Sequence, residues 1–276
     1  MNLKRLIPHS VKTRYAIRKE SSQLKQVPKA TCDVGNLKTL TAADLYQIFN
    51  SETITSDWNG LTPLREEFKL PNLKGGVNPG DQRAIYHLLK GLEAQSVLEI
   101  GTHIGSSTAH ISLALRDQPH PKLITVDIKD VNDPHSKPWI ALNSQYSPKE
   151  LVDKVGGSAF VDFKVMPSLD FMRNCQDKFD FIFLDGDHRA FTVYQEIPVA
   201  LKLLNPGGVI LLHDHFPENV PLWSDGKVSP GTFLATQRLK NEGHSLDILP
   251  LGELPWGTKL NSNVTSLALV TAANSH

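Results

Sequence analysis

The fold class is decided by one stretch of the chain, Glu99-Ile100-Gly101-Thr102-His103-Ile104-Gly105-Ser106-Ser107. The apolar run of residues 96–100 that leads into it predicts a short buried strand. Residues 107–116, which follow it, are predicted to form a helix. A glycine-bearing turn that joins a strand to a helix in this way favours an α/β fold.

Strand and helix patterns alternate on both sides of this turn. Strands are predicted over residues 96–100, 122–127, 159–165, 179–184 and 208–213, and helices over residues 81–92, 107–116, 148–155 and 193–204. This alternation predicts parallel strands joined by right-handed crossovers. Two further strands, 246–251 and 266–271, have no predicted helix between them and are expected to pair antiparallel. We therefore predict a three-layer doubly wound Rossmann-like α/β sheet, mostly parallel with an antiparallel C-terminal strand.

The N-terminal part of the chain differs from the rest in charge. Residues 1–29 hold eight basic residues against one acid, a net charge of +7, so the remainder carries −7 and the total is zero. A helix is predicted over residues 39–49 with Thr41 as its N-cap, whereas the Asn-, Gly- and Pro-rich residues 51–80 are predicted to be irregular. We expect a basic N-terminal arm with a helical extension over residues 1–74 and a catalytic domain over residues 75–276.

The composition excludes several classes of protein. The chain is 40% apolar and 21% charged, which is typical of a globular protein. It has no apolar run near the roughly 20 residues of a membrane-spanning helix and no secretory signal, so a cytoplasmic location is expected. Its two cysteines are too few for a disulfide framework or a thiolate zinc site.

The basic arm suggests an anionic partner. Leu3, Ile7 and Val11 recur at four-residue spacing among the basic residues, a pattern that suits peripheral contact with an anionic membrane at its inner face. Pro8 interrupts the pattern, and a solvated or partner-packed arm is the alternative.

The glycine turn does not fit a phosphate-binding loop. A dinucleotide fingerprint beginning at Gly101 would need glycines where His103 and Ser106 stand, and the chain has no Gly-Lys-Ser/Thr phosphate loop. The turn suits a ligand with an amino-acid portion and a ribose, with Glu99 supporting the ammonium region. Asp127 ends the next strand, where its two oxygens can accept both ribose hydroxyls. A tight strand-to-helix turn without a ligand is the alternative for the glycines alone.

Four motifs follow one another from residue 98 to residue 214. They read Leu98-Glu-Ile-Gly-Thr102 with Gly105-Ser-Ser107, Thr125-Val-Asp127, Phe179-Asp-Phe-Ile-Phe-Leu-Asp-Gly-Asp-His188, and Leu204-Asn-Pro-Gly-Gly-Val-Ile-Leu-Leu-His-Asp214. In this order they resemble the class I S-adenosylmethionine-dependent methyltransferases, in particular the catechol-type and sugar O-methyltransferase branch. The resemblance covers about residues 75–276.

The resemblance implies S-adenosyl-L-methionine as the cofactor. The residues implied in its binding are Glu99, Gly101, Thr102, His103, Gly105, Ser107, Asp127, Ser168 and Asp185. The turn residues would hold the methionine part, Asp127 the ribose, and Ser168 would lie beside the adenine. Met166 stands where relatives carry a glycine in the turn that contains Ser168.

Two clusters of aspartate and histidine follow the fourth and fifth strands. They are Asp185-Gly-Asp187-His188 and His213-Asp214-His215. The carboxyl ends of parallel strands meet at one rim, so both clusters are expected to face the glycine turn. Such clusters form either a metal site or a set of helix caps and loop hydrogen bonds. Carboxylate ligands favour Mg²⁺, and a histidine in the set leaves Mn²⁺ open.

The resemblance also implies roles within these clusters. Relatives hold a divalent metal with an acid at the place of Asp185 and an Asp-Asn pair at the place of Asp214 and His215, so these three are the predicted metal ligands. Alternatively, His215 does not bind the metal itself but orients a residue that does. His188 lies where relatives have a lysine or histidine base, and an imidazole accepts a proton near neutral pH. Asp185 and His188 are the predicted catalytic residues.

The predicted function is that of an enzyme, a divalent-metal-dependent O-methyltransferase that acts on a hydroxyl of a sugar, a glycan or another small molecule with adjacent oxygens. A catechol or phenolic acceptor, a phosphoesterase-like metal-dependent hydrolase and a catalytically silent binding module are the alternatives. The loop 215–231, with Phe216 and Trp223, is predicted to cover a sugar ring, and Trp256 either adds a wall or packs in the core. No nucleic-acid partner is expected, because the acidic body lacks a basic groove, and a homo-oligomer is left open.

Overall fold

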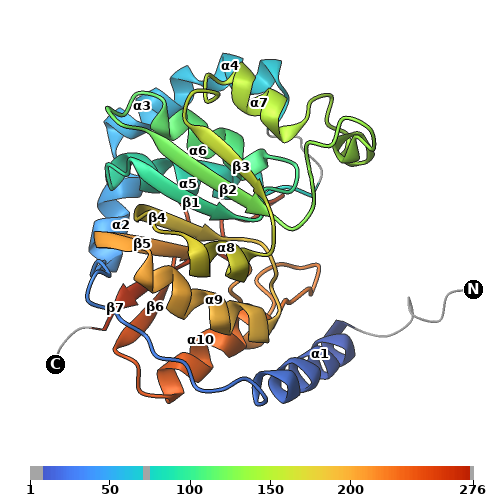
Figure 1. The fold of residues 1–276 in the computed structure, drawn as a ribbon, viewed down its shortest axis with the longest axis vertical. Helices are drawn as coiled ribbons and strands as arrows, with labels where there is room; N and C mark the ends of the chain where they lie inside the picture. The colour runs from blue at the N-terminus through green and yellow to red at the C-terminus, as the bar shows by residue number, and fades with distance from the viewer. Residues whose placement is uncertain (1–8, 71–74, 274–276) are drawn as a thin grey trace, which may run out of the picture.

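The computed structural model describes residues 9–70 and 75–273, and a seven-stranded sheet in the order β3-β2-β1-β4-β5-β7-β6 forms its centre (Figure 1). The strands are β1 Ser96–Ile100, β2 Lys122–Asp127, β3 Val161–Val165, β4 Phe179–Leu184, β5 Leu204–Leu212, β6 Leu246–Pro250 and β7 Ala268–Ala272. The pairings from β3 to β5 are parallel, whereas β7 is antiparallel to both β5 and β6. The predicted α/β doubly wound sheet is confirmed.

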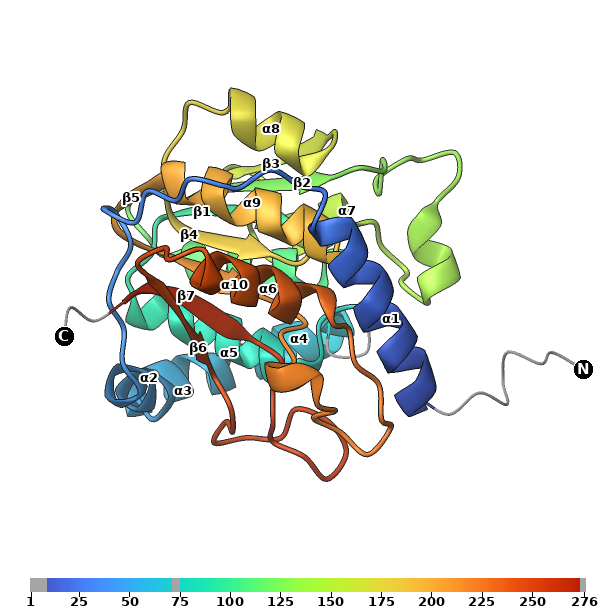
Figure 2. The same ribbon diagram turned by 90° about the horizontal axis from the view of Figure 1, so that it is seen from below.

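Helices cover both faces of the sheet (Figures 1 and 2). One face carries α2 Ala42–Phe49, α3 Glu52–Gly60, α4 Thr62–Glu67, α5 Pro79–Gly91, α6 Ser106–Leu115 and α7 Pro148–Lys154. The other carries α1 His9–Leu24, α8 Ser168–Asn174, α9 Ala190–Lys202 and α10 Gly231–Asn241. Two short 3₁₀ helices, η3 Pro138–Leu142 and η4 Pro217–Asn219, lie in connections.

The central strands are buried on both faces, which is why they appear in the sequence as continuous apolar runs. In β4, Phe181 and Phe183 enter the core on the α5 and α6 side, and Phe179 and Ile182 enter the core on the α9 side. The chain runs outward from β1 to β3 and then returns to β4 on the other side of β1. This reversal leaves a crevice at the carboxyl ends of β1 and β4.

The prediction of irregular chain over residues 51–80 is wrong, because α3, α4 and the start of α5 lie there. Ser51 caps α3 by accepting the Ile54 N–H, and a proline lies in the first turn of α4. Trp58 is buried against Tyr86 of α5, with ring centroids 5.3 Å apart. Tertiary packing of a few apolar residues therefore holds helices that the polar composition disfavours.

Two helices of the second layer were absent from the sequence-based prediction. α8 joins β3 to β4, and α10 joins β5 to β6. The first has only seven residues, and the second follows a long polar connection, so neither shows an extended apolar period. The predicted helix at residues 39–49 is confirmed as α2, with Thr41 and Asp44 forming a capping box.

The N-terminal arm contains the helix α1, which packs on α9 and α10. Leu24 is buried there, and the Glu20 carboxylate accepts the Ala190 N–H at 2.7 Å. The Arg238 guanidinium donates to the carbonyls of Leu24, at the end of α1, and of Val27, just after it. Leu3 and Ile7 lie outside the described residues, whereas Val11 is exposed on α1. Over the described ranges, no helix is long and apolar enough to cross a membrane. The domain boundary at residue 74 stays a prediction.

Candidate functional site

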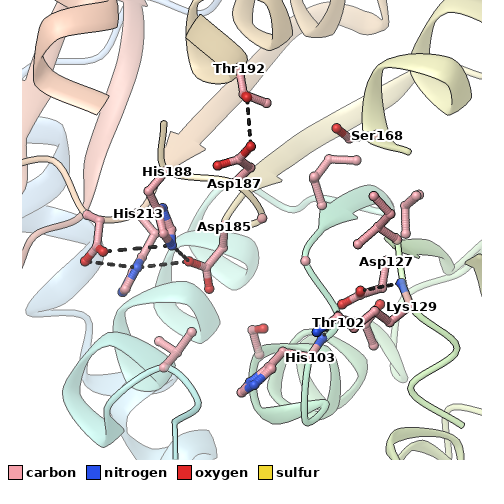
Figure 3. Close-up of a pocket in the computed structure, with 18 of the residues that line it drawn as sticks. Thr102, His103, Asp127, Lys129, Ser168, Asp185, Asp187, His188, Thr192 and His213 are labelled. Atoms are coloured by element: carbon pink, nitrogen blue, oxygen red, sulfur yellow. Dashed lines mark hydrogen bonds and ion pairs between the residues drawn. The ribbon is translucent and has the colours of Figure 1, made fainter. Parts of the chain in front are cut away.

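A cavity of about 790 Å³ opens beyond the carboxyl ends of the parallel strands (Figure 3). Its walls come from the segments that follow the strands, namely residues 100–104, 106–107, 126–129, 166–169, 185–189 and 213–214, together with residues 75–77 and Thr192. In Figure 3, Asp185, His188 and His213 gather at one end, and Thr102, His103, Asp127 and Lys129 lie at the other. The cavity therefore has two chemically different ends.

Gly101 shapes the floor between these ends. Its φ is +103°, and a Cβ atom there would lie 2.4 Å from the carbonyl oxygen of Asp185, closer than atoms approach. Glycine is thus required both for the backbone conformation and for the close pairing of the two loops. Gly105 is buried against Pro148 and shapes the turn from outside the cavity lining. The Thr102 hydroxyl lies 2.6 Å from the Thr125 hydroxyl, which fixes the turn to β2.

Glu99 lies beneath the turn, fully buried and outside the cavity lining. Its carboxyl accepts hydrogen bonds from the Thr108 and Thr125 hydroxyls, each at 2.6 Å. Burial raises the pKa of Glu99 to about 7. The structure therefore does not bring Glu99 to a ligand's ammonium group, as the sequence suggested, but places it as the support of the glycine turn.

Asp127 is held in place by backbone donors. One carboxylate oxygen accepts the His103 N–H at 2.8 Å, and the other accepts the Lys129 N–H at 3.0 Å. Each oxygen keeps a further lone pair for the cavity, as binding of a ribose diol requires. The predicted contact with ribose stays a prediction, and its geometry is compatible with these bonds.

Ser168 begins α8 and lines the cavity beside the exposed Met166. Its hydroxyl donates to the carboxyl of Glu196 on α9, with 2.5 Å between the oxygens. Glu196 is 1% exposed, and burial raises its pKa to about 7. Glu196 gave no signal in the sequence, because an acid within an amphipathic helix is ordinarily solvated.

The cluster at the other end joins residues from β4 and β5. Asp185 Oδ1 lies 2.9 Å from His213 Nδ1 and 3.6 Å from His188 Nε2. Asp214 lies 3.5 Å from His213 Nδ1 and 3.8 Å from His188 Nε2. His213 was part of the motif but was not assigned a role from the sequence, and the structure brings it to the centre of the cluster.

His213 is surrounded by carboxylates. Its second ring nitrogen, Nε2, lies 3.6 Å from Asp81, a fully buried residue in the first turn of α5. Burial alone would lower the pKa of His213, but the facing carboxylates, Asp185 foremost, outweigh it and raise the pKa well above 6.5. Asp81 was missed in the sequence because Asn78-Pro-Gly-Asp81 is typical of a helix start.

His215 does not join the cluster, and its assignment as a metal ligand is corrected. The side chain is buried outside the cavity lining, with its ring centroid 5.7 Å from that of Phe233. Burial lowers its pKa to about 4. The reason is the backbone of Asp214, whose φ of +54° breaks the strand alternation that would put His213 and His215 on one side.

Asp187 has the role of a loop acceptor. It accepts hydrogen bonds from the Arg189 side chain and backbone and from the Thr192 hydroxyl at 2.8 Å. Burial works against ionisation, but these donors prevail and lower the pKa of Asp187. The helix-cap alternative therefore describes Asp187, and its neighbours Asp185 and His188 remain available to the cavity.

The predicted sugar-covering residues lie elsewhere. Phe216 is buried against Trp223, whose indole N–H donates to the Val264 carbonyl at 3.2 Å. Trp256 packs on His87 with ring centroids 4.7 Å apart and donates to the Gly80 carbonyl. The side chains of Phe216, Trp223 and Trp256 all lie outside the cavity lining, so their apolar surface contributes to packing.

The donor set of the cluster fits a divalent metal ion. Ligand atoms of Asp185, His188 and His213 lie within 4.8 Å of one another, and Asp214 adds a second carboxylate. His213 Nδ1 and Asp81 Oδ1 are buried without a hydrogen-bond partner. Buried polar atoms ordinarily have partners, and a cation in the cluster would supply one for His213 Nδ1.

Known proteins share this architecture. A family model described as a methyltransferase domain matches residues 98–215. A caffeoyl-CoA O-methyltransferase from Zinnia elegans is 27% identical over 184 residues, 64% of this chain and 60% of the relative. Caffeoyl-CoA O-methyltransferase 2 from Eucalyptus globulus is 26% identical over 211 residues, 74% of this chain and 76% of the relative. The match with the Zinnia protein thus spans about 60% of that protein's length.

Solved structures show the same fold. The O-methyltransferase TomG from Streptomyces achromogenes, solved with SAM, has a TM-score of 0.54 at 20% identity over 85% of this chain and 97% of its own. An O-methyltransferase from Bacillus cereus, solved with SAH, has a TM-score of 0.52 at 18% identity over 85% of this chain and 98% of its own. Residues 98–215 therefore match a methyltransferase domain, and the chain has the same Rossmann-like fold as these O-methyltransferases.

Proposed function

We propose that this protein transfers the methyl group of S-adenosylmethionine to a hydroxyl oxygen of a small molecule or glycan with two neighbouring oxygens. One observation carries the proposal: a single cavity joins Asp127, which suits a ribose, to a cluster of two carboxylates and two imidazoles. The cavity lies at the reversal of strand order, where α/β sheets bind their ligands. The matched methyltransferase domain covers both ends.

The cavity residues divide the work of the reaction. Asp127 and the Gly101 turn hold the donor so that its methyl group points toward the cluster. Asp185, Asp214 and His213 would hold a divalent ion, which supplies orientation to the acceptor and lowers the pKa of its hydroxyl. His188, with its side chain 32% exposed, is placed to accept the hydroxyl proton as the oxygen attacks the methyl carbon. The C–S bond breaks in that step, and the sulfur leaves as a neutral thioether.

Two acceptor classes satisfy the same geometry. The relatives are named for caffeoyl-CoA, whose caffeoyl group carries neighbouring phenolic hydroxyls. The Asp185-Gly-Asp187-His188 motif instead resembles that of the sugar-directed O-methyltransferases, a resemblance that supports a sugar diol. Methyl transfer from labelled S-adenosylmethionine to catechols and to sugar diols, measured in parallel with Mg²⁺ and Mn²⁺, separates the two. A metal-dependent hydrolase is not favoured, since hydrolysis leaves the Asp127 end of the cavity without a role.

The first prediction concerns the proton acceptor. His188→Ala is expected to lower turnover by about 100-fold or more, because general-base catalysis contributes factors of that size. Calorimetric binding of S-adenosylhomocysteine should be unchanged, since His188 lies away from Asp127 in the cavity. His135→Ala, an exposed histidine, is the matched control. Turnover of His188→Ala at the wild-type level would exclude His188 as the base.

Contact of the N-terminal arm with an anionic membrane stays a separate proposal. It is supported by exposed apolar and basic residues on α1, namely Val11, Lys12, Arg14, Tyr15 and Arg18. Flotation of the full chain with phosphatidylserine vesicles tests it, and absence of flotation at low salt rejects it.

A further inference from the structure

We propose that the Asp185 cluster binds a transition-metal dication such as Mn²⁺ in preference to Mg²⁺, and that the buried Asp81 is the positioning residue that makes His213 a ligand. This inference rests on the proposed function and deepens it. It names the class of ion, and it adds Asp81 of α5, which lies outside the sequence motifs that follow the strands.

The first step is the chemistry of the donors. Mg²⁺ prefers oxygen ligands and retains its waters, whereas imidazole nitrogen suits transition-metal dications such as Fe²⁺ and Zn²⁺. Mn²⁺ shares the oxygen preference of Mg²⁺ but also accepts imidazole beside carboxylates, so it suits a set that mixes the two. His213 Nδ1 is buried and lies 2.9 Å from Asp185 Oδ1 and 3.5 Å from Asp214 Oδ1. By strict geometry it has no hydrogen-bond partner in spite of this proximity. An ion among the three groups would give each lone pair a partner.

The second step is the position of Asp81. Its side chain is 0% exposed, and the ion pair that it makes is with His213, at 3.6 Å between Oδ2 and Nε2. The same Oδ2 accepts the side-chain N–H of Asn78 at 2.5 Å, whereas Oδ1 has no partner. A buried carboxylate is unfavourable unless it is paired, and its place in the first turn of α5 offers only part of that pairing.

The third step follows from the two nitrogens of one ring. Asp81 faces Nε2 at 3.6 Å, so a hydrogen on Nε2 would point toward that carboxylate. With an ion in place of the Nδ1 proton, Nδ1 would present its lone pair to the ion between Asp185 and Asp214. A carboxylate behind a histidine ligand fixes the tautomer and the orientation of the ring in this way. The alternative is a purely structural ion pair between α5 and β5, which would stabilise the fold without affecting any ion.

Titration calorimetry with the full chain, freed of metal by chelation, tests the selectivity. We expect Mn²⁺ to bind at least about tenfold more tightly than Mg²⁺. His213→Asp replaces nitrogen with oxygen and is expected to reduce this preference by about tenfold. Pulsed electron paramagnetic resonance of the Mn²⁺-loaded protein should show nitrogen coupling that weakens in His213→Asp. Equal or tighter binding of Mg²⁺ to the wild-type protein would overturn the proposal.

Asp81→Asn tests the positioning role. Mutation of such outer carboxylates typically costs about 10–100-fold in metal affinity, and we expect a loss of this size for Mn²⁺. In the His213→Asp background the same substitution should cost nothing further in Mn²⁺ affinity, whereas a loss caused by general destabilisation of the fold would persist in that background. Asp225→Asn, an exposed carboxylate paired with Lys227, is the matched control. Unchanged Mn²⁺ affinity in a folded Asp81→Asn protein would refute the positioning role.

Two further measurements keep the test decisive. Circular dichroism melts establish that each variant is folded. If Asp81→Asn fails to fold, Asp81→Glu takes its place, and its loss of Mn²⁺ affinity should likewise be absent in the His213→Asp background. Titration of metal-free protein with S-adenosylhomocysteine reports on the donor end alone. Binding of Mn²⁺ without binding of S-adenosylhomocysteine would reject the proposed methyl transfer and leave the metal inference standing. Binding of S-adenosylhomocysteine without binding of Mn²⁺ would reject the metal inference.

Discussion

Two buried carboxyl groups lie behind the cavity and hydrogen-bond to the side chains that support its wall. Glu99 supports the glycine turn through Thr125, and Glu196 holds the Ser168 hydroxyl at the cavity wall. Burial raises the pKa of both to about 7, where an ordinary carboxyl group would be ionised. Their ionisation therefore couples the stability of the protein to pH in the neutral range.

Replacing Glu196 by Gln is expected to flatten this pH dependence. In the folded protein the Glu196 carboxyl keeps its proton up to about pH 7, whereas in the unfolded chain it loses the proton near its ordinary pKa of 4.5. The stabilising contribution of the protonated carboxyl is therefore fully present below pH 4.5 and is lost as the pH rises through 7. Over this range the free energy of unfolding of the wild type should fall by about 3 kcal/mol relative to that of Glu196→Gln. Urea unfolding at pH 5 and pH 8 measures the difference.

The exposed Glu67→Gln serves as the control for this comparison and should follow the wild-type profile. Parallel pH profiles for wild type and Glu196→Gln would contradict the expectation.

At the scale of elements, the loop that carries Asp185 and His188 is held between three helices. It leads directly into α9, whose first N–H is bound by Glu20 of α1. The first residue of α10, Gly231, packs on the other side, where an added Cβ would lie 1.9 Å from the His188 carbonyl oxygen. The appended helix α1 and the crossover helix α10 thus take part in positioning the cluster.

Gly231→Ala is expected to displace the His188 backbone. The steric overlap cannot be relieved by a flexible side chain, since the atoms it meets belong to the backbone of His188, Arg189 and Ala190. We expect a loss of about 1–3 kcal/mol in the free energy of unfolding and a fall in turnover larger than the fall in S-adenosylhomocysteine affinity. Urea denaturation and steady-state kinetics check both. Gly60→Ala, where no atom lies within 4 Å of the added Cβ, should behave as wild type.

At the scale of the molecule, the cavity draws on the ends of five parallel strands and on the segment before α5. A ligand bound there contacts parts of the chain that unfolding would separate. Binding to the folded state alone must therefore stabilise the whole protein.

S-adenosylhomocysteine at 100 times its dissociation constant is expected to raise the free energy of unfolding by about 2.7 kcal/mol. Asp127→Ala should lose most of this gain at the same ligand concentration, because it removes the acceptor held by the His103 and Lys129 N–H groups. Chemical denaturation with and without ligand measures the effect. Asp130→Ala, an exposed acid three residues on, should retain the full gain, and equal gains in both variants would exclude Asp127 from the site.

The sequence by itself determined the sheet and the strand-end residues. Strands buried on both faces leave continuous apolar runs, and an α/β topology sends the residues at the strand ends to one rim. The sequence therefore predicts Gly101, Asp127, Asp185 and Asp214 at that rim, and all four line the cavity. These features depend on local periodicity and on chain order, both of which the sequence contains.

Only the tertiary structure decided which histidine enters the cluster and what stands behind it. The choice of His213 over His215 depends on the left-handed backbone at Asp214, a conformation that no sequence period encodes. The pairing of Asp81 with His213, of Glu196 with Ser168 and of Glu20 with Ala190 joins residues far apart in the chain. Such contacts arise from the packing of helices on the two faces of the sheet, and the identity of the facing residue is fixed only when those helices have docked.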